Sequence, residues 1–277
     1  MTVSDHPIWR RLQPVVTVLS VAVLIGIPLW LVVVTAGKSR GEALEPDLSL
    51  PAEWHLLGNL RQVWSDADVP AAVLGSLLIV VPTVAAVLGF GSLAAWILAR
   101  RASRLNAVLY ALGISGIILP PAVVTVVLLL RQLGLAGTAI GMIGVYTGIY
   151  LSTVIFFVTG FVRTIPAALE ESAQIDGAGP FTVFRRIVLP LLRPVLATAT
   201  ILITLYVWND VFYAFFVIGG RLDTLPLNLF RVASAGLYLN NWHLIFAYVI
   251  LMSLPLVVVF AVAQRKVIAG ITGGAVK

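Results

Sequence analysis

The side chains best suited to chemistry in this sequence are an amide and an acid, Asn209 and Asp210, set among aromatic residues. Asp210 is the only acid inside an apolar stretch long enough to cross a bilayer, and a charge is so costly there that it is a functional candidate by default. The pair can hydrogen-bond a hydroxylated substrate, or it can hold two helices together. The surrounding aromatic faces suit sugar rings, and they equally suit an interfacial belt or a bundle core. The candidate substrate-pathway residues are Tyr206, Trp208, Asn209, Asp210 and Tyr213.

The common kinds of enzyme site have no support in the sequence. His6, His55 and His243 are isolated, so neither an HExxH zinc pattern nor a nucleophile beside a base is present. The absence of cysteine excludes disulfides and thiolate metal sites. The GxxxxGK[ST] loop that holds ATP in many proteins is also missing from the sequence. We therefore expect no catalytic residue, metal site or cofactor in this chain.

The composition is that of a membrane protein. Of the 277 residues, 60% are hydrophobic and 11% are charged, and the mean hydropathy is +1.04. A bilayer core about 30 Å thick needs roughly 20 apolar residues per helix. The predicted fold class is therefore an all-α membrane protein with one membrane domain over residues 1–277. Its six predicted spans are residues 15–36, 71–99, 105–130, 139–162, 194–218 and 244–264.

The distribution of basic residues predicts the topology. With a cytoplasmic N-terminus, the inside segments hold twice as many Lys and Arg residues as the outside segments. The positive-inside rule then puts both termini in the cytoplasm, with outer loops at 37–68 and 219–243 and a cytoplasmic loop at 163–193. The acidity of the 37–68 loop fits an extracytoplasmic face. The basic cluster at 100–104 follows a span, where anionic headgroups are a more natural partner than nucleic acid.

The 163–193 loop is too polar to lie in a membrane, and its glycines and prolines predict two short helices. Thr164 and Pro166 can start the first helix, with Thr164 capping free amides, and Ala167 to Asp176 would continue it. Gly177 permits the backbone conformation that ends it.

The second helix of this loop is predicted at Phe181 to Leu189. Pro180 can open it, and it should stop before Pro190 because a residue that precedes proline avoids helical angles. An apolar stripe would run along it. That stripe consists of Phe181, Phe184 and Ile187.

The spacing in this loop resembles the EAA loop of binding-protein-dependent ABC importer permeases. The residues that match are Glu171, Ser172, Ala173, Gly177, Ile187, Leu189 and Pro190. Ser172 replaces the usual Ala and is small enough for a close helix contact. Residues similar to the sugar-importing branch are Asp176, Gly177, Ala178, Phe184 and Pro194.

Other segments resemble permeases of the maltose-transporter G-subunit type. They are Leu119-Pro120-Pro121, Gly134-Leu135, Trp208-Asn209-Asp210, Thr224-Leu225-Pro226-Leu227 and Gly274-Ala275-Val276-Lys277. A second proline that usually follows the pair at 120 and 121 is missing here. The resemblance nevertheless covers most of the chain.

The resemblance implies a type I ABC importer permease fold in a bacterial or archaeal cytoplasmic membrane. The implied partners are a second related permease, two ABC ATPases that hold ATP and Mg, and an extracytoplasmic sugar-binding protein. This chain would be a non-enzymatic subunit forming half of the pathway for a mono- or oligosaccharide or a related polyol.

The implied role of the 163–193 loop is a coupling helix docked in an ATPase groove. Glu171 would make a polar contact, Ala173 would allow a close helix approach, and Gly177 would form the turn. The full set of implied coupling residues is Glu170, Glu171, Ser172, Ala173, Asp176, Gly177, Ala178, Phe184, Ile187, Leu189 and Pro190. The implied contacts to the binding protein are Arg221, Asp223, Leu225, Pro226 and Trp242.

Two alternatives remain open at this point. An ABC permease for a non-sugar solute would carry a similar loop. A secondary transporter would have similar composition and rare buried charges, although it would not need the cytoplasmic pair of helices.

Overall fold

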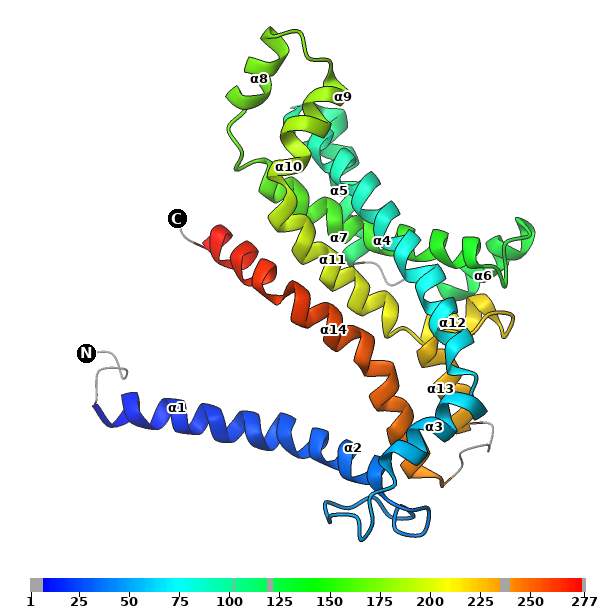
Figure 1. Ribbon diagram of the computed structural model, residues 1–277. Helices are drawn as coiled ribbons and strands as arrows, with labels where there is room; N and C mark the ends of the chain where they lie inside the picture. The colour runs from blue at the N-terminus through cyan, green and yellow to red at the C-terminus, as the bar shows by residue number, and fades with distance from the viewer. Residues whose placement is uncertain (1–6, 102, 119–121, 235–239, 276–277) are drawn as a thin grey trace. The chain divides into compact units, whose positions relative to one another are not determined.

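The computed structural model describes residues 7–101, 103–118, 122–234 and 240–275, and in this part every regular element is a helix (Figure 1). The α-helices are α1 (Pro7–Val21), α2 (Ile27–Gly37), α3 (Leu56–Asp66), α4 (Val69–Arg100), α5 (Arg104–Ile118), α6 (Val123–Gln132), α7 (Ala139–Val162), α8 (Ala168–Ile175), α9 (Pro180–Val183), α10 (Leu189–Leu191), α11 (Arg193–Trp208), α12 (Phe212–Ile218), α13 (Leu225–Ser234) and α14 (Trp242–Ala275). Two π-helical turns, η2 (Ala22–Gly26) and η3 (Phe184–Val188), continue the helices before them. The predicted all-helical class is thus confirmed for the described residues.

Within the described residues, four helical segments are long and apolar enough to cross a bilayer: Leu12–Gly37, Val69–Arg100, Ala139–Val162 and Trp242–Ala261. Two bent helix pairs raise the number to six if each pair is one span. Arg104–Ile118 and Val123–Gln132 meet at 112°, and Pro180–Leu191 and Arg193–Trp208 meet at 74°. The exact number of spans remains a prediction.

The chain divides into two compact units, Met1–Pro70 with Asn228–Leu254, and Ala71–Leu227 with Pro255–Lys277. In the first unit, the acidic loop after α2 is organised by Lys38, which is 1% exposed. Its Nζ donates hydrogen bonds to the Asp47 carboxylate and to Ser49 Oγ. Asn59 of α3 donates to the carbonyls of Ala36 (2.8 Å) and Lys38 (2.9 Å). The hydrogen bond from Lys38, followed by those from Ser49, lowers the pKa of Asp47 to about 2.

In the second unit, small residues allow the helices to approach α7 closely. A Cβ added at Gly91 of α4 would lie 2.6 Å from Val154 Cγ1, and one added at Gly116 of α5 would collide with Ser152. Small residues at helix contacts are typical of membrane bundles, where packing replaces the hydrophobic effect.

The structure corrects the predicted start of the first loop helix. The Thr164 hydroxyl donates to Phe161 O at 2.8 Å, so it closes the end of α7 and caps nothing. The helix α8 begins at Ala168 without a side-chain cap. The prediction for Gly177 is confirmed, because its φ of +83° is the left-handed conformation that glycine favours.

The predicted stop before Pro190 is wrong. The second loop helix begins at Pro180, as predicted, and continues through η3 and α10 to Leu191. Leu189 N–H donates to Phe184 O, five residues back, and Pro190 lies in the first turn of α10. A missing N–H is tolerated in a first turn, and the π-helical turn absorbs the change in hydrogen bonding.

The predicted span 194–218 is two helices in the structure, α11 and α12. Asn209 Nδ2 donates to Leu205 O at 2.9 Å, and Asp210 Oδ2 accepts the Ala214 N–H at 3.1 Å. Such short-range side-chain bonds compete with the backbone ladder. Asp210 therefore lies at a helix break and not inside a continuous helix. In the predicted span 105–130, the Leu119-Pro120-Pro121 segment lies outside the described residues, as do Val276 and Lys277 at the C-terminus.

Candidate functional site

Helices α8 to α10, with the turns between them, lie at the C-terminal end of α4 (Figure 1). We call this segment, residues 168–191, the island. Its turn is closed by backbone hydrogen bonds from Gly177 N–H to Gln174 O (3.0 Å) and from Ala178 N–H to Ala173 O (2.9 Å). Ile175 is 86% exposed before this turn, and Phe181 is 70% exposed after it. Exposed apolar side chains in an otherwise polar segment are typical of a protein contact surface.

The predicted coupling residues divide between the two sides of the island. The exposed residues are Glu171, Ser172, Asp176 and Gly177. The half-buried residues are Ala173, Ala178, Ile187, Leu189 and Pro190. Glu170 and Phe184 are buried, and both contact α4. Sequence reasoning missed Ile175 and the exposure of Phe181, because Phe181 was assigned to an apolar stripe that is buried only at Phe184.

Glu170 is held by two side chains of α4. Its Oε2 accepts a hydrogen bond from Trp96 Nε1 at 2.8 Å, and its Oε1 pairs with Arg100 Nε at 2.8 Å. Arg100 also donates through Nη2 to Ile165 O at 2.8 Å. The Trp96 ring lies 5.4 Å from that of Phe184, centroid to centroid. We call Trp96, Arg100 and Glu170 the α4 clamp.

A second candidate site surrounds Asp210. The Tyr146 hydroxyl on α7 donates to Asp210 Oδ2 at 2.7 Å. Since the same oxygen accepts the Ala214 N–H, Asp210 joins α7 to the start of α12. Of the two open interpretations of this acid, the geometry favours helix packing.

Aromatic rings extend from this contact along α7 and α11. Tyr150 stacks on Tyr206, with centroids 5.7 Å apart and planes 7° apart, and also lies 6.1 Å from Tyr146. Tyr213 meets Tyr146 edge-on at 6.5 Å. The structure thus brings together Tyr206, Asp210 and Tyr213 of the predicted set, whereas Trp208 is buried and Asn209 bonds to its own helix.

Sequence reasoning missed Tyr146 and Tyr150. Their spacing of four residues puts both on one face of α7, and this was the available signal. Tyr206 is 52% exposed, so the stack presents an accessible aromatic face at one end.

The predicted contacts to a binding protein are also divided. Leu225 and Pro226 are buried, and Leu225 N–H donates to Ser76 Oγ of α4 at 2.9 Å. These two side chains pack within their own chain and are not available to a partner. Asp223 is half-buried, whereas Arg221 and Trp242 are exposed.

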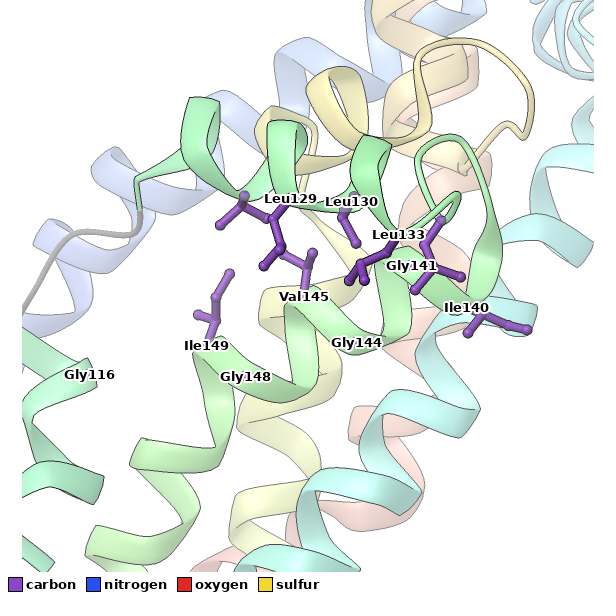
Figure 2. Close-up of a pocket in the computed structure, with 12 residues that line it drawn as sticks. Gly116, Leu129, Leu130, Leu133, Ile140, Gly141, Gly144, Val145, Gly148 and Ile149 are labelled. Carbon is purple, nitrogen blue, oxygen red and sulfur yellow. The ribbon is translucent and has the colours of Figure 1, made fainter. Parts of the chain in front are cut away.

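Figure 2 shows an apolar cavity of about 520 Å³ between α6 and α7. Leu129 of α6 and Val145 and Ile149 of α7 point into it. Gly144 and Gly148 leave the space open, since a Cβ at either would meet nothing within 4 Å. Sugar sites need converging polar groups, so this cavity is a poor candidate for one. Among the described residues, no group of three or more His, Asp or Glu side chains could hold a metal ion.

Comparison with known proteins agrees with this architecture. Residues 87–272 match the family described as binding-protein-dependent transport system inner membrane component. The melibiose/raffinose/stachyose import permease protein MelC of Bacillus subtilis (strain 168) is 35% identical over 260 residues, 91% of each chain. The multiple sugar-binding transport system permease protein MsmG of Streptococcus mutans serotype c is 31% identical over 92% of this chain and 93% of its own length.

Among solved structures, the fold is similar to that of a chain in a bacterial ABC transporter involved in the import of the acidic polysaccharide alginate. The TM-score is 0.80 at 20% identity, over 96% of this chain and 98% of that chain. The predicted type I permease fold is thereby supported for the chain as a whole. The family match and the identity to MelC show that this protein belongs to the family of inner membrane components of binding-protein-dependent transport systems.

Proposed function

We propose that this chain is the permease subunit of an ATP-driven importer and forms half of the translocation pathway for a sugar. Family membership supports the importer, and relatives named as permeases for melibiose, raffinose, stachyose and multiple sugars support the sugar. The substrate class is a mono- or oligosaccharide or a related polyol, delivered by an extracytoplasmic binding protein.

The observation that carries the coupling role is the island. It ends in a tight turn at Gly177 flanked by exposed Ile175 and Phe181, and it also exposes the Glu171 carboxylate. An ATPase groove that accepts apolar side chains and offers a cation to Glu171 would fit this surface. ATP and Mg belong to two partner ATPases, because the chain has no phosphate-binding loop of its own.

The membrane arrangement that we propose has six spans, with both termini and the island in the cytoplasm and a second, related permease beside this one. The positive-inside distribution supports the orientation. In the pathway, Tyr150, Tyr206 and Tyr213 offer aromatic faces to the sugar, while Asp210 holds the break between α11 and α12. On the outer side, Arg221 and Trp242 are the proposed contacts to the binding protein.

Reconstitution tests this function. The complex purified from its native membrane should contain two ATPases and a second permease. In proteoliposomes with ATP on the side that the ATPases face, it should transport sugar only when a binding protein is present on the opposite side. A panel of melibiose, raffinose, a polyol and an amino acid identifies the solute class. Uptake without ATP, driven by an ion gradient, would refute the importer, and ATP-dependent uptake of only the amino acid would refute the sugar.

A further inference from the structure

The two adjacent glutamates at the start of α8 face opposite sides of the island. Glu171 is exposed, whereas Glu170 is 5% exposed. A carboxylate is seldom buried to this degree unless it is paired and hydrogen-bonded. The two residues are of the same type and adjacent in sequence, so the difference between them comes from their surroundings in the fold.

Both oxygens of Glu170 are used by a single turn of α4. Trp96 and Arg100 are four residues apart, so their side chains lie on the same face of that helix, and each contacts one carboxylate oxygen at 2.8 Å. Arg100 is itself fixed by Ile165 O at 2.8 Å, in the segment between α7 and α8. The α4 clamp therefore connects the last turn of α4 to the first turn of α8.

The second arm of the island contacts the same turn through an aromatic pair. Phe184 of η3 is 7% exposed and lies against Trp96. Beyond these contacts the island and α4 separate, since a cavity of about 700 Å³ opens between them. Its lining residues include Leu93 and Ile97 of α4, Arg101 directly after α4, and Gln174, Ala178 and Phe181 of the island. Near the turn at Gly177, the island is therefore not packed on α4, and the α4 clamp with Phe184 makes the connection.

We propose that Glu170 is a positioning residue for transport: it fastens the island to α4 so that the two move as one body, while Glu171 faces the ATPase. This inference rests on the proposed function of the island. Energetic coupling between distant sites travels through contacts of this kind. Removing one member of a buried ion pair leaves the other uncompensated, so the clamp should be sensitive to single substitutions.

The test uses the complete importer complex, reconstituted in lipid with its binding protein. Three quantities are measured for each variant: ATPase subunits retained per permease, ATP hydrolysed, and sugar taken up. Glu170→Ala and Arg100→Ala should retain the ATPases and hydrolyse ATP, while sugar transported per ATP falls about tenfold or more, as expected for the loss of hydrogen bonds to charged groups. The milder Trp96→Phe keeps the ring beside Phe184 and loses one hydrogen bond, so its ratio should fall about two- to fivefold.

Arg101→Ala is the matched control, because it removes an adjacent arginine that lies outside the clamp. Its ratio of sugar to ATP should equal that of the wild type. By contrast, Glu171→Gln should reduce the number of ATPase subunits retained. These two variants separate loss of the clamp from loss of basic charge and from loss of docking.

A wild-type ratio in Glu170→Ala would overturn the proposal, as would a loss of ATPase in that variant equal to the loss in Glu171→Gln. If Glu170→Ala fails to accumulate in the membrane, an unchanged ratio in Trp96→Phe overturns it instead. A wild-type complex without ATPases would refute the proposed function, and this result is read before any variant is compared.

Discussion

Gly75 of α4 lies against the backbone of Asp223 in the loop before α13. A Cβ at position 75 would come closer than 3.0 Å to Asp223 O, a separation that real Cβ atoms essentially never show. Next to it, Ser76 Oγ accepts the Leu225 N–H at 2.9 Å. Because the obstacle is backbone and not a flexible side chain, Gly75→Ala should push this loop away from α4.

The size of the effect is set by the steric cost in the attached state. Overpacking costs typically about 1–3 kcal/mol. The Ser76 hydrogen bond is lost on detachment in wild type and variant alike, and the better helix propensity of Ala stabilises α4 in both states of the loop, so neither changes the balance. The attached state of the loop should therefore lose about 1–3 kcal/mol, which raises the population of the detached loop about 5- to 150-fold.

Trypsin cleavage after the exposed Arg221 measures this population in the purified complex. When a segment opens and closes faster than it is cut, the cleavage rate follows the open population. Gly75→Ala should be cut at least about fivefold faster than the wild type. Gly89→Ala is the control on the same helix, since its Cβ meets nothing within 4 Å. Equal cleavage rates in the two variants would refute the steric argument.

Three further predictions concern other contacts. The Thr138 hydroxyl caps α7, so Thr138→Ala should lower the free energy of unfolding by about 1 kcal/mol and lower the Tm of the complex. Thr138→Ser should restore the Tm, and an unchanged Tm in the alanine variant would contradict this assignment. Tyr146→Phe should lower the free energy of unfolding by about 0.6–2 kcal/mol, and so lower Tm, without changing the KM for uptake, because it removes the hydrogen bond to Asp210. A raised KM at unchanged Tm would instead show that the contact between Tyr146 and Asp210 serves the substrate. The pKa of Asp47 is lowered from 3.8 to about 2, so its contribution to loop stability is complete above about pH 4 and is lost as the pH falls towards 2. The protection of the Ser49 amide against hydrogen exchange, taken relative to the intrinsic rate at each pH, should fall in that window in the wild type and not in Asp47→Asn, because the Ser49 N–H donates to Asp47; identical pH profiles would contradict the assignment.

The sequence was most informative where structure depends on neighbouring residues. Gly177 and Pro180 predicted the turn and the second helix of the island because their backbone preferences act locally. The same local reasoning failed at Thr164 and Pro190. The Thr164 hydroxyl donates to a carbonyl of the preceding helix, and the Leu189 N–H donates five residues back through a π-helical turn; residue preferences alone specify neither partner.

Contacts between distant segments could not be predicted. Tyr146 and Asp210 are 64 residues apart, and Trp96 and Glu170 are 74 apart. Nothing in the local pattern distinguishes buried Glu170 from exposed Glu171, since only the position of α4 decides between them. The helices and turn of the island were therefore located from sequence, while the direction in which each of its side chains points required the fold.

The 74° corner between Pro180–Leu191 and α11 makes the island a lever arm. At about 1.5 Å per residue the arm is roughly 18 Å long, and a rotation of about 10° would carry its far end about 3 Å. Leu192 at the corner is fully buried, and the Glu170 carboxylate ties the other arm to α4. Under the proposed role of the α4 clamp, both attachments hold the lever, and a displacement of a few ångströms at Gly177 would be transmitted as a tilt of α4 and α11 together.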